Sequence, residues 1–114
     1  MASYSKVKKS TGANGRMTKV VQTATPGTLV HTMSASLGEL WLYAVNTDTV
    51  AREITVELGG VTAPDDLIPV TISPRSGLFL VVPGTLLDGS VEVRVFAAAA
   101  NVVNILCWEN RITP

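Results

Sequence analysis

At 114 residues, the chain is long enough for one domain with a small core and too short for several domains. Hydrophobic residues make up 46% of the chain and charged residues only 16%, yet no apolar run reaches the 18 residues of a membrane helix. The single cysteine, Cys107, excludes a disulfide within the chain, and one cysteine with one histidine is too few for a zinc site.

The formal net charge is zero, but the charges are unevenly distributed. Residues 20–114 hold four basic and nine acidic residues, whereas residues 1–19 hold no acid and five basic residues, namely Lys6, Lys8, Lys9, Arg16 and Lys19. Residues 1–16 are otherwise rich in Ser, Thr, Gly and Asn, which predicts an extended basic N-terminal arm before a domain over residues 17–114. Such an arm could contact nucleic acid, but it has no aromatic residue beyond Tyr4, so we favour docking on an acidic face of a neighbouring subunit.

No apolar segment of a secretion signal opens the chain, so we expect production in a cytoplasm. After the arm, short runs of alternating or β-branched residues are separated by turn signals, which predicts strands. The predicted strands are Met17–Thr23, Thr28–Met33, Glu39–Asn46, Ala51–Leu58, Leu67–Ser73 and Leu78–Val82. Pro69 cannot donate to a sheet ladder, so its strand should be an edge strand or carry a bulge.

Two of these strands have informative faces. In residues 39–46, Leu40, Leu42 and Ala44 take one face while Trp41, Tyr43 and Val45 take the other. A strand that is apolar on both faces has to be central or covered by another subunit. In residues 51–58, Glu53 and Glu57 alternate with aliphatic residues, and we interpret them as a solvated face rather than as paired catalytic carboxylates.

The most apolar stretch is Val91–Trp108, which contains only two charged residues. Its two halves alternate as strands, and Ala98–Asn101 between them supplies material for a turn, so we predict a C-terminal hairpin. A short Ala-rich helical turn is the alternative for the connection. The second strand is apolar on both faces, and residues 109–114 should form a polar tail.

About eight short strands with frequent turn signals predict an all-β fold, an antiparallel β-sandwich of jelly-roll or Ig-like type, or a small barrel. No catalytic constellation is present, so we do not expect an enzyme or a cofactor. His31, within a predicted strand, is interpreted as a hydrogen-bonded structural residue. Asp65 and Asp66 are interpreted as loop residues, because two adjacent acids fall short of the ligands that a calcium ion needs.

The chain encodes more apolar strand surface than a small domain can cover, which predicts self-association. We place Trp41 and Tyr43 at the self-association face and expect Lys6, Lys8, Lys9 and Arg16 to act as a basic clasp. A carbohydrate-binding module is the alternative from another class, since β-sandwiches often carry such sites. Four of the six aromatic residues lie in apolar strands, which weakens that alternative.

Four segments resemble small virion structural proteins encoded beside the head genes of tailed bacteriophages. The segments are GTLVHT (27–32), ELWLYAVNTDTVAREITVELGG (39–60), LIPVTISPRSGLFLVVPG (67–84) and VEVRVFAAAANVVNILCWENRIT (91–113), and they cover most of the body but not the arm.

The resemblance implies a capsid decoration, or cement, protein, assembled in the host cytoplasm and displayed on the virion surface. Such proteins commonly form trimers and bind between major capsid subunits, using terminal arms as clasps. A neck, tail or baseplate protein is the alternative within the same class. Neither a membrane nor nucleic acid is an expected partner.

Overall fold

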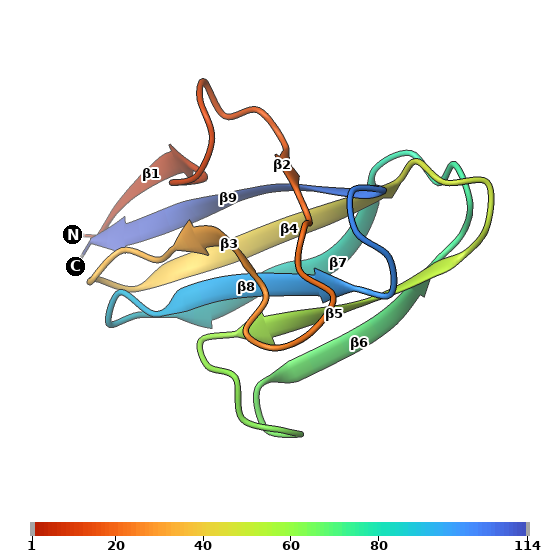
Figure 1. The fold of residues 1–114 in the computed structure, drawn as a ribbon. Coiled ribbons are helices and arrows are strands. Elements are labelled where there is room, and N and C mark those ends of the chain that lie inside the picture. The colour runs from red at the N-terminus through yellow and green to blue at the C-terminus, as the bar shows by residue number, and fades with distance from the viewer. Residues whose placement is uncertain (1, 114) are drawn as a thin grey trace.

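In the computed structural model, which describes residues 2–113, the chain forms nine strands and no helix (Figure 1). The strands are β1 (Ser3–Lys8), β2 (Thr18–Lys19), β3 (Thr28–Thr32), β4 (Gly38–Asn46), β5 (Arg52–Leu58), β6 (Leu67–Ile72), β7 (Phe79–Leu87), β8 (Glu92–Ala97) and β9 (Val103–Thr113). The predicted all-β class is therefore confirmed, and most of the predicted strands are present within one or two residues of their expected ends.

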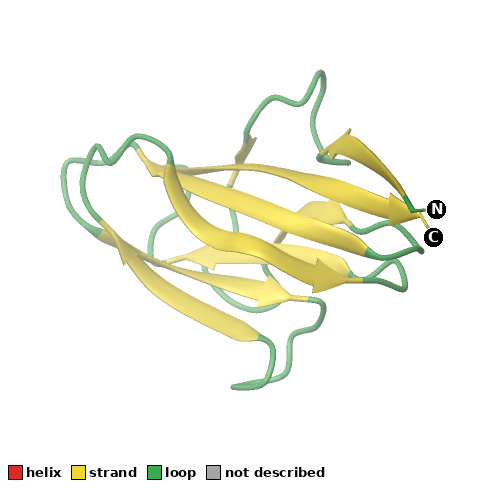
Figure 2. Cartoon of the chain, turned by 180° about the vertical axis from the view of Figure 1, so that it is seen from behind, coloured by secondary structure: helices red, strands yellow, loops and turns green. Residues whose placement is uncertain are grey.

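The strands form two antiparallel sheets that face each other (Figure 2). Sheet A has the order β1–β9–β4–β7, with β2 pairing β9 beyond the end of β1, and sheet B has the order β3–β8–β5–β6. Because side chains alternate along each strand, one face of each sheet supplies the core. The core consists of Val20, Val30, Met33, Leu40, Leu42, Ala44, Ile54, Val56, Ile72, Val82, Val93, Val95, Ala97, Val103, Ile105 and Cys107.

The strand pairings are nested along the chain. β2 pairs β9, β3 pairs β8, β4 pairs β7 and β5 pairs β6, like one long hairpin whose tip is the loop between β5 and β6. Further pairings of β4 with β9 and of β5 with β8 join these ladders into the two sheets. Among the strands described for residues 2–113, β5 and β6 are the only two that are consecutive in sequence and paired with each other.

The prediction of a C-terminal hairpin is wrong, although both of its strands exist. β8 belongs to sheet B and β9 to sheet A, so the connection around Asn101 (φ 68°) crosses from one sheet to the other and contains no helix. The inward faces of both strands contribute to the core between the sheets. The inward residues are Val93, Val95 and Ala97 of β8 and Val103, Ile105 and Cys107 of β9.

The C-terminal residues are not a polar tail, because β9 continues to Thr113 and pairs with β1. The predicted first strand, 17–23, shrinks to the two residues of β2 because only Val20 beside it enters the core. β7 is longer than predicted and includes Pro83 and Gly84. It is an edge strand with two register irregularities, and β6, which holds Pro69, is the edge of sheet B as expected.

Within the arm predicted for residues 1–16, Ser3–Lys8 forms β1 at the edge of sheet A, in register with β9. Its side chains are exposed except for the half-buried Val7. Met1 and Pro114 lie outside the described residues. The arm therefore follows the sandwich closely, although β1 contributes little side-chain burial to it.

Candidate interaction face

The outer face of sheet A combines aromatic and aliphatic side chains from three strands. Register partners in an antiparallel ladder point to the same side of a sheet, so the pairings define this face row by row. One row joins Trp108, Trp41 and Pro83, and the next row joins Leu106, Tyr43 and Leu80. We call these six residues the outer apolar face.

Two tryptophans lie at the centre of the outer apolar face. The rings of Trp41 and Trp108 are stacked, with centroids 5.8 Å apart and planes 11° from parallel. Both side chains remain partly exposed. A Cβ atom on Gly84 (φ 78°) would lie only 2.9 Å from the Trp41 ring, so the glycine at this position makes room for the indole. Trp41 and Tyr43 thus share the face opposite Leu40, Leu42 and Ala44, as the alternation predicted, and their role in self-association stays a prediction.

The apolar surface continues towards β7. Leu78 and Leu86 are 55% and 56% exposed, values far above those of core leucines. A hollow of about 470 Å³ lies between Leu78, Leu106 and Met17, with Arg16 on its rim. An exposed apolar area of this kind is typical of a surface that contacts another macromolecule.

Towards β1 the outer apolar face is bordered by basic residues. Lys6 and Lys8 project from β1, and the ammonium group of Lys6 lies 5.4 Å from the centroid of the Trp108 ring, within cation–π range. Arg16 is exposed on the loop that follows. On this face Glu39 accepts a hydrogen bond from Asn110 Nδ2 at 2.8 Å.

Lys9, the fourth basic residue predicted for the clasp, lies elsewhere. Its side chain is 1% exposed, and its ammonium group donates to the Thr11 carbonyl oxygen at 2.5 Å. Burial lowers the pKa of Lys9 from its ordinary value, because the charged form loses its hydration. Lys9 therefore stabilises the turn at Thr11 through this hydrogen bond and does not belong to the exposed basic border.

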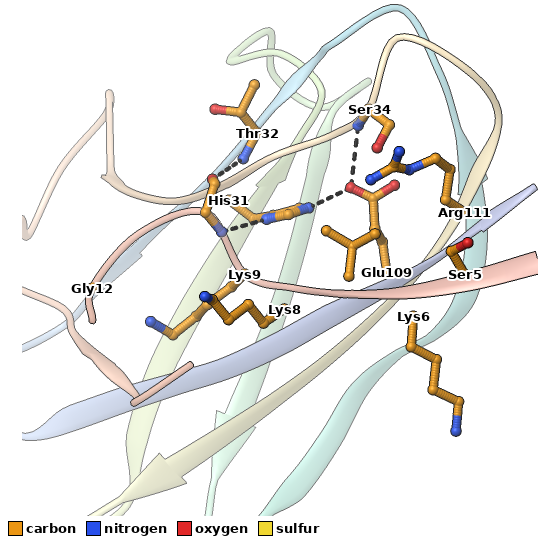
Figure 3. Close-up of a pocket in the computed structure, with 12 residues that line it drawn as sticks. Ser5, Lys6, Lys8, Lys9, Gly12, His31, Thr32, Ser34, Glu109 and Arg111 are labelled. Carbon is orange, nitrogen blue, oxygen red and sulfur yellow. Dashed lines mark hydrogen bonds and ion pairs between the residues drawn. The ribbon is translucent and has the colours of Figure 1, made fainter. Parts of the chain in front are cut away.

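His31 and Glu109 form a buried pair behind β1 (Figure 3). His31 Nε2 lies 2.8 Å from Glu109 Oε1, which also accepts from the Ser34 N–H, and His31 Nδ1 accepts from the Ser10 N–H. The hydrogen-bonded structural role expected for His31 agrees with this geometry. Glu109 was missed in the sequence, although it continues the inward alternation of Cys107 by one step.

A pocket of about 650 Å³ opens beside the His31–Glu109 pair. Three lysines line it, but their side chains diverge. The ammonium group of Lys6 points away from those of Lys8 and Lys9, and none of the three is directed at Glu109 (Figure 3). The arrangement therefore does not converge on a single ligand, and we do not treat the pocket as the functional site.

On sheet B, the segment before β3 covers part of the outer face. Glu57, expected in solvent, is fully buried beneath this segment, and its carboxylate accepts from Thr25 Oγ1 and from the Gly27 N–H, both at 2.6 Å. Arg94 donates to the Gly27 carbonyl oxygen at 3.1 Å. Glu53, four residues earlier on β5, is exposed as expected.

The Cys107 thiol should make native-state stability depend on pH in the alkaline range. Burial raises its pKa from 9.0 to about 12. The folded chain thus holds this proton more tightly than the unfolded chain, so the stabilisation is complete below about pH 9 and lost as pH rises towards 12. At pH 10, wild type should have lost about 1 kcal/mol more than Cys107→Ala, as denaturant titrations from pH 8 to 11 would measure. Parallel curves would contradict this expectation.

Comparison with protein-family models, with curated proteins and with solved structures gives no match. Among residues 2–113, no three His, Cys, Asp or Glu side chains lie close enough together to hold a metal ion. Over the same residues, no helix is present that could cross a membrane. The function has to be inferred from the outer apolar face and its basic border.

Proposed function

We propose that the chain is a non-enzymatic structural protein of a tailed-bacteriophage virion. Within that class we propose a capsid decoration, or cement, protein that binds between major capsid subunits on the surface of the head. The observation that carries the proposal is the outer apolar face, where a stacked tryptophan pair and exposed leucines lie uncovered in the isolated chain. The segment resemblance to small virion proteins supplies the biological class.

The topology supports the proposed class. Counting β1 and β2 as one interrupted strand, the nested pairings describe an eight-stranded hairpin rolled into two sheets. We infer a jelly roll on this ground and not an Ig-like sandwich, since jelly rolls are double-sheet folds of eight strands and are frequent in viral capsids.

We further propose that the chain acts as a homo-oligomer, with a trimer favoured. The outer apolar face is the part of sheet A that would be buried between copies, and the basic border beside it would meet acidic groups on the capsid. Tryptophan is enriched among residues that dominate interface energy, which makes the Trp41–Trp108 pair the expected centre of the contact.

Trp41→Ala should dissociate the oligomer without unfolding the domain. Truncating a central interface tryptophan costs about 2 kcal/mol or more of association energy, which is about thirtyfold in Kd. Sedimentation velocity over a concentration series measures the effect. Phe96→Ala is the matched control, because Phe96 is half-buried on the outer side of sheet B and should leave the assembly intact. A monomeric wild type, or an unchanged assembly in folded Trp41→Ala, would reject the self-association face.

The double variant Lys6→Glu/Lys8→Glu, which reverses the charge of both side chains, should weaken attachment to virus heads. Both side chains are exposed on β1, so their substitution spares the core. Co-sedimentation with heads stripped of this protein should show reduced occupancy, and wild-type binding should fall with added salt because exposed charges are screened. Arg75→Glu, in the turn between β6 and β7, is a control that lowers the net charge by half as much at a site away from the basic border. Unchanged occupancy would reject the clasp.

The stacked tryptophans also favour a second candidate, a carbohydrate-binding module, because partly exposed aromatic rings can serve as stacking platforms for sugars. A glycan array distinguishes the two functions. Specific glycan binding that Trp108→Ala abolishes would support the second candidate against the decoration role. A neck, tail or baseplate position, the alternative within the first class, would appear as density away from the head in a particle reconstruction.

A further inference from the structure

The N-terminal segment is fastened to the sandwich at residues 10 and 11. The Ser10 N–H donates to His31 Nδ1 at 2.9 Å, and Ser10 Oγ accepts from the Thr32 N–H at 2.8 Å. Thr11 Oγ1 donates to the Val30 carbonyl oxygen at 2.6 Å. All three bonds join the segment to β3, on the opposite sheet from β1, so they close the sandwich along this border.

The strand before this fastening contributes little burial. Every side chain of β1 is exposed except that of Val7, so β1 is held mainly by its backbone ladder with β9. Elements with few buried apolar contacts open at low free-energy cost. Loss of the Ser10 hydrogen bond to His31 should therefore make the whole of β1 open more easily.

The hydrogen bonds of His31 determine which nitrogen carries its proton. Nδ1 accepts from the Ser10 N–H, so the neutral imidazole must be protonated at Nε2, which then donates to Glu109 Oε1. Both side chains are 1% exposed. This network is complete only while Nδ1 is unprotonated.

We propose that His31 is a proton-sensitive latch for the N-terminal segment. Protonation of Nδ1 turns the acceptor of the Ser10 N–H into a second donor, so that bond is lost and two N–H groups face each other. The imidazolium keeps its ion pair with Glu109, which stabilises the charged state in the interior. The released segment then frees the edge of β9. The latch is independent of the proposed virion role, because it rests on the intramolecular contacts alone.

Both acidic and basic groups surround His31. The groups that face or flank it are Glu109, Cys107 and Arg111 from β9, Lys8 from β1, Lys9 from the segment after β1, and Glu92 from β8, next to Val93, the register partner of His31. One oxygen of Glu109, Oε2, has no hydrogen-bond partner among the described residues and lies against Gly38.

Hydrogen exchange of the β1 amides, monitored by NMR and corrected for intrinsic rates, tests the latch. Between pH 7.5 and pH 5.0, we expect wild-type protection to fall about tenfold, the size expected for the loss of one part-buried hydrogen bond. The imidazole nitrogen shifts of His31 report its protonation in the same samples. The chemical shift of the Ser10 amide should change together with the protonation of His31. This measurement uses the wild-type protein alone.

Two substitutions separate the two nitrogens of His31. His31→Asn retains an acceptor near the position of Nδ1 that does not titrate, so β1 should stay protected at both pH values. His31→Gln places its amide near Nε2 and removes the Nδ1 acceptor, so β1 should be loosened at both. Three results would overturn the latch: an imidazole that remains neutral at pH 5.0, a doubly protonated imidazole with β1 still protected, or equal loss of protection in His31→Asn.

Discussion

Glu57→Ala should lower the free energy of unfolding by about 3 kcal/mol, whereas Glu53→Ala should change it by less than about 0.5 kcal/mol. The Glu57 carboxylate is fully buried and accepts from Thr25 Oγ1 and the Gly27 N–H. Its removal leaves a buried backbone donor without an acceptor and opens a cavity beneath the covering segment. Glu53 is exposed on the same strand and has no comparable partners to lose.

Urea titrations of both variants at one protein concentration measure this difference, since any oligomer would link stability to concentration. Glu57→Gln serves as the second control. It retains one acceptor oxygen and nearly the same volume, so its loss should fall between those of the two alanine variants. Equal stabilities of the Glu57→Ala and Glu53→Ala proteins would contradict the buried position of Glu57.

Gly27→Ala should destabilise the fold by about 3 kcal/mol or more, the upper range for overpacking. A Cβ at this position would lie 2.5 Å from the Val95 carbonyl carbon and 2.6 Å from its oxygen. These are backbone atoms of a core strand, so the clash cannot be relieved by rotating a side chain. The covering segment would have to move away from β8 and would release both Glu57 and Arg94.

Gly77→Ala is the matched control for Gly27→Ala. Nothing lies within 4 Å of a Cβ added there, so only its positive φ of 68° opposes the substitution, at a cost of about 1 kcal/mol. Thermal unfolding followed by circular dichroism compares the two variants. If Gly27→Ala were the milder of the two, the close approach to Val95 would be disproved.

Glu53 and Glu57 of β5 show what strand periodicity can predict about burial and what it cannot. Alternation correctly places both on the outer side of sheet B, but it does not say what covers that side. The cover is the irregular segment before β3, whose position depends on long-range bonds to Glu57 and Arg94. Because such a segment has no period, its burial of Glu57 could not be predicted from the local sequence.

The candidate site was predictable in its strands and less so in its loops. Alternation along β4 alone puts Trp41 and Tyr43 on one face, and the structure adds Trp108 and Leu106 from β9 through the strand pairing. Lys9 was misplaced because composition describes the arm as a whole, whereas its burial depends on a contact specific to one turn. The pairing of β9 with β4 is long-range, so no local pattern indicates it.

The nested order of pairings has a consequence for the synthesis of the chain. β9 pairs with β1, β2 and β4, so the centre of sheet A cannot close before residues 103–113 have left the ribosome. Until then, β4 can pair with β7 and the strands of sheet B can pair with one another, but the edge of β4 that β9 occupies stays open. Long-range pairing of this kind typically gives folding times of milliseconds to seconds. During that interval the open edge of β4 is exposed to misassembly, and chaperone contact should be concentrated there.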